Sequence, residues 1–210
     1  MIIPVILETE FEEVTRKVRL IEEYVKLIQI DIVDGILVNG KTFLDISQLD
    51  ALNAKTTLEL DLMVQNPLDY ISLINNVKGV VIPVEAENVG TSINASKDLG
   101  SRTGVSIAPN TSLETLNLFA ANVDFVQFMT IEPGGQGRPF QEMVLEKIKT
   151  FKENYPSMPV QVDGGINSET IKKVLDVGVN DIVVGSAIFD SEDPVKTLKE
   201  FQMQVEDYKL

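Results

Sequence analysis

The chain has 210 residues, of which 44% are hydrophobic and 24% charged, a composition typical of a globular protein long enough to bury a core. Its formal net charge of -14 argues against binding to nucleic acid or to an anionic membrane as the main task, and no apolar run has membrane-spanning length. Cysteine and histidine are both absent, which excludes disulfides, zinc–histidine sites and every catalytic triad that needs an imidazole.

Strand-like and helix-like patterns alternate along the whole chain. In chain order the pairs are a strand near 2–7 and a helix near 10–24, then 26–32 and 44–54, 57–63 and 67–76, 79–84 and 89–99, 103–108 and 112–121, 123–129 and 141–154, 159–163 and 168–177, and 181–184 and 193–204. Ser112 and Asn167 open sequences typical of helix N-caps, and Gly100 and Gly178 stand where C-caps are expected.

Eight strand-then-helix units without a Ser/Gly/Pro-rich linker predict a parallel α/β sheet. Eight is the number that closes a (β/α)8 TIM barrel, so we expect one barrel domain over residues 1–210. A doubly wound open sheet is the alternative, but the Gly-x-Gly-x-x-Gly fingerprint and the Walker loop are both missing from the sequence. Residues 1–8 contain no basic segment typical of a secretory signal, and a chain without cysteine fits a reducing compartment, so we expect a cytoplasmic protein.

Carboxylates stand at the ends of the first four predicted strands, where barrel enzymes place their working residues. They are Glu8, Asp31, Asp34, Asp61 and Glu85, and Asp163 ends the seventh strand. Aspartate is costly to bury without compensation, so Asp31 and Asp163 predict a paired acid/base site. Two carboxylates on opposite faces of one carbon suit an epimerisation, in which one removes a proton and the other returns it. Asp34 and Glu132 are expected to be solvated loop residues.

Glycine accumulates in the loops after the last three predicted strands. Backbone N–H groups approach an anion closely where no Cβ intervenes, so these loops predict a phosphate site. The residues concerned are Gly134, Gly135, Gln136, Gly137, Gly164, Gly165, Gly185 and Ser186.

Six ordered segments resemble the ribulose-phosphate 3-epimerase family. They begin at residues 4, 29, 61, 128, 162 and 184 and include the sequences QIDIVDGILV, DLMVQNPLDY and FMTIEPGGQGRPF. The resemblance implies a TIM barrel of the ribulose-phosphate-binding type and an epimerase acting on carbon 3 of D-ribulose 5-phosphate to give D-xylulose 5-phosphate. It assigns the acid and base to Asp31 and Asp163 and places Met63 and Met129 in the site. It also implies a divalent metal on the same aspartates, a phosphorylated ketose as the ligand, and a homo-oligomer.

The chain departs from the family pattern where the metal would bind. Gln29 and Asp61 occupy the positions of two histidines, Glu8 replaces a serine expected to contact the substrate, and Val33 and Pro83 replace a methionine and a third histidine. A site of Gln29, Asp31, Asp61 and Asp163 offers only oxygen, which suits Mg2+ or Mn2+ better than Zn2+. No organic cofactor is expected.

Two other functions stay open at this point. One is a non-catalytic phosphosugar-binding barrel, which the missing histidines favour. The other is an epimerase or isomerase acting on a different ketose phosphate. A related decarboxylase would need a lysine where Met63 stands, and no strand ends on a lysine suited to a Schiff base.

Overall fold

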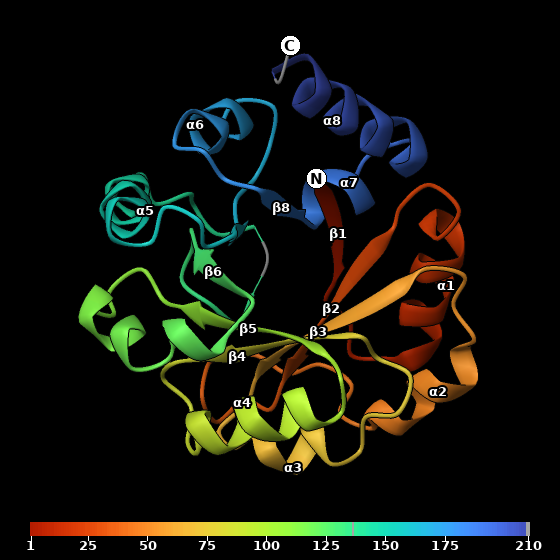
Figure 1. The fold of residues 1–210 in the computed structure, drawn as a ribbon. Helices are drawn as coiled ribbons and strands as arrows, with labels where there is room; N and C mark the ends of the chain where they lie inside the picture. Colours follow the sequence, from red (N-terminus) through yellow and green to blue (C-terminus); the bar gives the residue numbers. More distant parts are fainter. Residues whose placement is uncertain (136, 209–210) are drawn as a thin grey trace.

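Eight parallel strands close into a barrel in the computed structural model, which describes residues 1–135 and 137–208 (Figure 1). Each strand pairs with the next, and β1 pairs with β8, so the sheet has no free edge. The predicted TIM barrel is confirmed. The strands are β1 (Ile2–Ile6), β2 (Leu27–Val33), β3 (Thr57–Met63), β4 (Gly79–Pro83), β5 (Arg102–Ile107), β6 (Phe125–Met129), β7 (Val160–Asp163) and β8 (Asp181–Val184).

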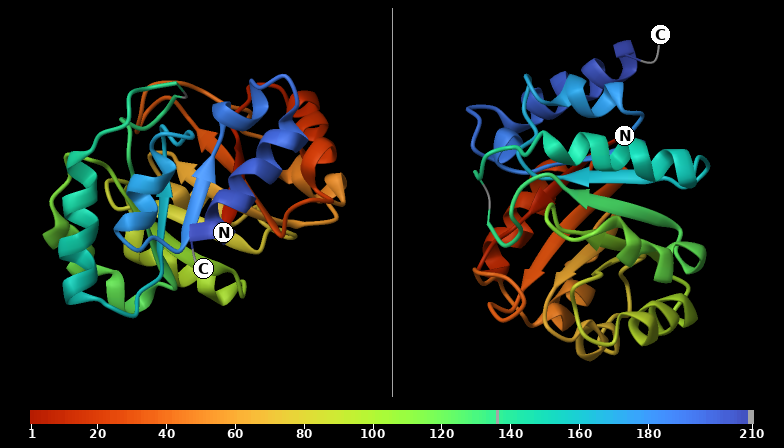
Figure 2. Two further views of the ribbon diagram at one scale, coloured as in Figure 1. Left: turned by 90° about the horizontal axis from the view of Figure 1, so that it is seen from above. Right: turned by 90° about the vertical axis from the view of Figure 1, so that its left-hand side faces the viewer.

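Helices surround the barrel, and the strand arrowheads point toward a common end (Figure 2). No helix among residues 1–135 and 137–208 has the length and apolarity that crossing a bilayer requires. The α-helices are α1 (Phe11–Ile21), α2 (Leu49–Leu52), α3 (Pro67–Ile71), α4 (Val89–Asp98), α5 (Met143–Asn154), α6 (Ile171–Asp176), α7 (Ser186–Phe189) and α8 (Pro194–Tyr208), with 3-10 turns η1 (Ile46–Gln48), η2 (Leu113–Leu118) and η3 (Ala120–Asn122).

Local signals decide where these helices begin and end. Gly100 and Gly178 have φ values of +74° and +76°, which confirms them as left-handed helix ends. The Asn167 side chain accepts hydrogen bonds from the N–H groups of Glu169 and Thr170, as an N-cap does. Ser112 does not cap: its hydroxyl contacts the Glu114 carboxylate instead, and the helix expected near 112–121 forms only 3-10 turns.

Alternation along each strand separates two apolar cores. On β2, Ile28, Ile30 and Ile32 face the helices and join the large core between barrel and helices. A small second cluster, made of Ile3, Val5, Leu27 and Val183, fills part of the barrel interior. The remaining interior positions are largely polar, and they define the site.

Candidate active site

Three aspartates meet at the C-terminal end of the barrel. Asp31 on β2 and Asp61 on β3 are register partners, so their side chains project side by side, and Asp163 ends β7. Each offers one carboxylate oxygen, and these oxygens lie within 4.8 Å of one another. Their exposed fractions are only 4%, 0% and 7%. The barrel therefore concentrates three acids in a buried space where their charges cannot be screened by water.

Burial raises the pKa of each carboxyl in this triad. Burial, with a smaller opposing effect from the Gly164 N–H, brings the pKa of Asp163 to about 7. Burial and then the neighbouring charge of Asp163 raise the pKa of both Asp31 and Asp61 well above the usual value for aspartate. The triad therefore retains protons, or binds a cation, at neutral pH.

The hydrogen bonds of the triad leave a fully buried oxygen of Asp61 without a partner among the described residues. The Gln29 amide donates to Asp31 Oδ1 at 3.2 Å, and the Gln127 amide donates to Asp61 Oδ2 at 2.6 Å. Asp61 Oδ1 is buried and has no hydrogen-bond partner among the described residues. An unpartnered buried carboxylate oxygen beside two other carboxylates is a position that a proton or a hard cation would satisfy.

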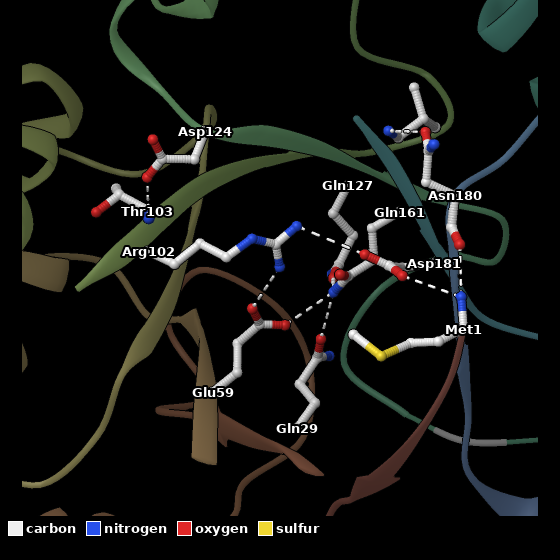
Figure 3. A network of polar contacts seen from close by, with 11 residues as sticks. Met1, Gln29, Glu59, Arg102, Thr103, Asp124, Gln127, Gln161, Asn180 and Asp181 are labelled. Carbon is white, nitrogen blue, oxygen red and sulfur yellow. Dashed lines mark hydrogen bonds and ion pairs between the residues drawn. The ribbon is translucent and has the colours of Figure 1, made fainter. Parts of the chain in front are cut away.

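Three amide side chains, from Gln29, Gln127 and Gln161, meet the Glu59 carboxylate inside the barrel, and we call this set the amide layer (Figure 3). Gln29, Glu59, Gln127 and Gln161 stand two residues before Asp31, Asp61, Met129 and Asp163 on their strands, so they project into the same interior. Gln161 Nε2 lies 3.0, 2.9 and 2.8 Å from the side-chain oxygens of Gln29, Glu59 and Gln127. One amide nitrogen carries two hydrogens, so it cannot serve all three acceptors at once.

Ion pairs connect this layer to the opposite end of the barrel (Figure 3). Arg102 lies 3.4 Å from Glu59 and 3.5 Å from Asp181, and its guanidinium stacks 3.9 Å over the Phe125 ring. The Met1 amine lies 3.0 Å from Asp181. Polar contacts thus run through the barrel from its N-terminal end to the triad.

Glycine loops border the pocket that Asp31 and Asp163 line, which we call the triad pocket. Gly164 and Gly165 have φ values of +114° and +64°, and a Cβ on Gly164 would lie 2.4 Å from Ile131. Only glycine fits this close turn after β7. The pocket is also lined by Met63, Met129, Gly134, Gly135, Gly137, Gly185 and Ser186. Most of the residues predicted to bind substrate are therefore brought together. Gln136 lies outside the described residues.

The sequence of this chain matches a protein family and individual members of it. Residues 1–189 match the Ribulose-phosphate 3 epimerase family. The chain belongs to the ribulose-phosphate 3-epimerase family. It is 33% identical to the cytoplasmic isoform of ribulose-phosphate 3-epimerase from Oryza sativa subsp. japonica, covering 98% of this chain and 94% of the relative. It is 30% identical to ribulose-phosphate 3-epimerase from Bacillus subtilis (strain 168), covering 95% and 96%.

Solved structures share the fold at low identity. The chain superposes with a TM-score of 0.77 and 13% identity on KGPDC from Streptococcus mutans, covering 99% of this chain and 97% of that chain. With 3-hexulose-6-phosphate synthase from Salmonella typhimurium the TM-score is 0.72 at 16% identity, covering 97% and 98%. These likenesses show the barrel alone.

Two residues predicted for the site of this family member have other partners. Gln29 Oε1 accepts a hydrogen bond from Gln161 while its nitrogen faces Asp31, so Gln29 presents no free oxygen to the triad. The Glu8 carboxylate lies 2.5 Å from Lys17 Nζ on α1, an ion pair that turns it toward the helix layer. The roles predicted for both residues would require these contacts to break.

Two loops of the epimerase barrel meet across its mouth. A Cβ on Gly134, in the loop after β6, would lie 2.2 Å from the Asn39 carbonyl oxygen, and one on Gly40 would lie 2.4 Å from the Gly134 carbonyl oxygen. Asp34 accepts hydrogen bonds from the N–H groups of Ile36 and Gln65 and so organises the loop after β2.

Arg138 holds the loop after β6 rather than facing an anion. Its guanidinium donates to the carbonyl oxygens of Glu132 and Pro133, at 2.9 and 2.6 Å. The same loop contacts the loop after β2 where Gly134 meets Gly40, and we call this contact the loop bridge.

Proposed function

We propose that this chain is a sugar-phosphate 3-epimerase that interconverts D-ribulose 5-phosphate and D-xylulose 5-phosphate. The observation that carries the proposal is the convergence of Asp31 and Asp163, with raised pKa values, in a pocket bordered by glycine loops. The names of the rice and Bacillus relatives, both ribulose-phosphate 3-epimerases, support this reaction.

The two aspartates supply the proton transfers. One ionised carboxylate removes the proton from carbon 3, which is acidic because it adjoins the ketone, and an enediolate forms. The other, protonated, carboxyl returns a proton to the opposite face, and the roles exchange when the reaction reverses. The raised pKa values of Asp31 and Asp163 allow one acid to keep its proton at neutral pH while the other is ionised.

Asp31, Asp61 and Asp163 are proposed to hold a divalent cation. The set fits one because it is buried and all oxygen, and because Asp61 Oδ1 has no other partner among the described residues. Hard oxygen ligands favour Mg2+ or Mn2+ over Zn2+. When bound, the cation would polarise the ketone and stabilise the negative charge of the enediolate.

The glycine loops are proposed to bind the substrate phosphate through backbone N–H groups. Gly164, Gly165, Gly185 and Ser186 line the pocket near Asp163, and Met63 and Met129 pack against the sugar from the other side. The side chains that line this pocket include no lysine or arginine among the described residues, so backbone donors carry the task.

Deuterium uptake tests the proposal. Incubated in D2O with Mg2+ or Mn2+, the protein should place deuterium at carbon 3 of D-ribulose 5-phosphate. Asp31→Asn and Asp163→Asn should each slow uptake by on the order of 100- to 10,000-fold. Asp69→Asn, at an exposed position on α3, is the matched control and should exchange normally.

The alternatives give different results in the same assay. Tight, phosphate-dependent binding of the pentulose without exchange would indicate a non-catalytic binding protein. Exchange with a hexulose phosphate but not with the pentulose would indicate another ketose. A cytoplasmic location and a homo-oligomer are further proposals. The rice relative is a cytoplasmic isoform and an Arabidopsis thaliana relative is chloroplastic, so the compartment varies among relatives.

A further inference from the structure

A second chamber adjoins the triad pocket at the barrel mouth. Met63, Met129 and Pro133 line both spaces, so the two share a wall. The second chamber lies over β3 to β6 and is completed by Pro83, Ser106 and Ala108, with Leu37 and Val38 from the loop after β2. Its walls are mostly apolar, and no function has been assigned to this chamber so far.

Ser106 is the one buried residue with a hydroxyl in that wall, among the residues that the structure describes. It is 2% exposed, and it stands two residues after Gly104, whose missing Cβ makes room for the Phe125 ring inside the barrel. No hydrogen bond joins its hydroxyl to any residue in the described part of the chain, although its carbonyl accepts from Val84 N–H at 2.9 Å.

Several other buried hydroxyls have partners. Ser96 and Thr103 bond to each other at 2.8 Å, and Thr130 donates to the Asp163 carbonyl at 3.0 Å. Since Ser106 lines the chamber and no described residue bonds to its hydroxyl, that hydroxyl is available to a polar group that enters the chamber.

The proposed position of the substrate indicates which of its polar groups would reach Ser106. The phosphate on carbon 5 is held near β7 and β8, and carbon 3 lies at the triad. In a ring of eight strands, β4 lies opposite β8 and β3 opposite β7. The end of the ketose farthest from the phosphate therefore points toward β3, β4 and β5, and it carries the hydroxyl on carbon 1.

We propose that the second chamber receives the carbon-1 end of the ketose and that the Ser106 hydroxyl hydrogen-bonds to its oxygen. Ser106 is then a specificity-determining residue, and this inference rests on the proposed function. The charged residues that line the chamber in the described part of the chain, Glu85 and Glu132, are both acidic and oppose a second phosphate at carbon 1. The chamber thus selects a 1-hydroxy ketose monophosphate and rejects a bisphosphate.

A pair of substrates that differ only at carbon 1 tests this. D-Xylulose 5-phosphate carries the hydroxyl, and 1-deoxy-D-xylulose 5-phosphate lacks it. Ser106→Ala should lower kcat/KM for D-xylulose 5-phosphate by about 5-fold, the loss expected for one hydrogen bond, and leave exchange of the 1-deoxy compound unchanged. Ser92→Ala on α4 is the matched control, since the Ser92 hydroxyl is also buried without a partner among the described residues but lies outside the chamber.

Two results would overturn the inference. An equal loss on both compounds would show that Ser106 acts on the fold, and no loss on either would show that it does not contact carbon 1. If the wild type exchanges neither compound, the proposed function fails separately, and calorimetric binding of the same two compounds replaces kinetics. Binding weakened by Ser106→Ala for D-xylulose 5-phosphate alone would still support the subsite, and any other pattern would reject it.

Discussion

Asp61 is the residue whose surroundings differ most from an ordinary buried aspartate. One oxygen is held by Gln127 at 2.6 Å, and the other has no partner among the described residues. The Gln127 amide therefore orients the carboxylate through Oδ2 alone, and Oδ1 stays available for a proton or a cation. Such an oxygen suits the cation proposed above.

Removing that amide should destabilise the metal-free protein. Gln127→Leu leaves the Asp61 carboxylate with no donor, which we expect to cost about 1–3 kcal/mol of unfolding free energy, measured by urea denaturation in EDTA. The control is a double-mutant cycle with Asp61→Asn, in which Gln127→Leu should cost clearly less. An equal cost in both backgrounds would mean that Gln127 stabilises the amide layer and not Asp61.

At the scale of elements, the loop bridge joins the segments that follow β2 and β6. These strands lie opposite each other in the ring, so the contact spans the mouth between the triad pocket and the second chamber. It depends on two glycines whose φ values, +113° for Gly40 and +91° for Gly134, favour glycine and whose Cβ positions are filled by backbone of the other loop.

A single methyl group should separate these loops. Gly134→Ala must move Asn39 and should raise KM for D-ribulose 5-phosphate by roughly 10-fold or more, because misplacing binding groups weakens orientation. Gly100→Ala is the matched control: its φ is also positive, at +74°, but nothing lies within 4 Å of the added Cβ. It should cost some stability and leave KM unchanged. Equal KM values for the two variants would contradict a role of the bridge in binding.

For the whole molecule, the triad sets how stability depends on pH. The pKa of Asp163 rises on folding from the usual 3.8 to about 7, and those of Asp31 and Asp61 rise as well. Between these values the folded protein binds more protons than the unfolded chain, so its unfolding free energy falls as pH increases. We expect the metal-free protein to lose a few kcal/mol of stability between about pH 4 and pH 7, measured by urea titration in EDTA.

Two controls accompany this measurement. Asp61→Asn removes one titrating acid and should make the decline shallower. Saturating Mn2+ should reduce the decline, because a bound cation stabilises the ionised carboxylates. Stability that stays level or increases over this pH range would show that the triad is ionised without cost.

The sequence predicts the barrel and its acids well because both leave strong signals. Eight β-branched runs, of which the first four and the seventh end on carboxylates, are enough to predict Asp31 and Asp163 at one mouth. The sequence alone does not reveal the amide layer, although Gln127 and Gln161 stand two residues before strand-end residues of the site, and that spacing puts them on the same face. Gln29 is predicted as a ligand because a sequence does not show that Gln161 donates a hydrogen bond to its oxygen.

Two of the expected helices do not form as predicted, and local features of the chain accompany both differences. The segment near 44–54 forms only η1 and the four-residue α2, which ends where Asn53 takes a left-handed conformation with a φ of +46°. The segment near 112–121 has apolar positions but no effective cap, since Ser112 contacts Glu114. Neither deviation alters the end of the barrel that carries the triad.

The loop bridge also has a consequence for how a ligand leaves the barrel. In the proposed pose a ketose phosphate would fill both chambers, of which the first is lined by Gly134 and the second by Val38. We therefore expect the two loops to part when that ligand leaves, a motion of the kind that takes microseconds to milliseconds. A ligand confined to one chamber should leave without that step. For the full substrate we expect product release, rather than proton transfer, to limit turnover, so that kcat decreases as solvent viscosity increases.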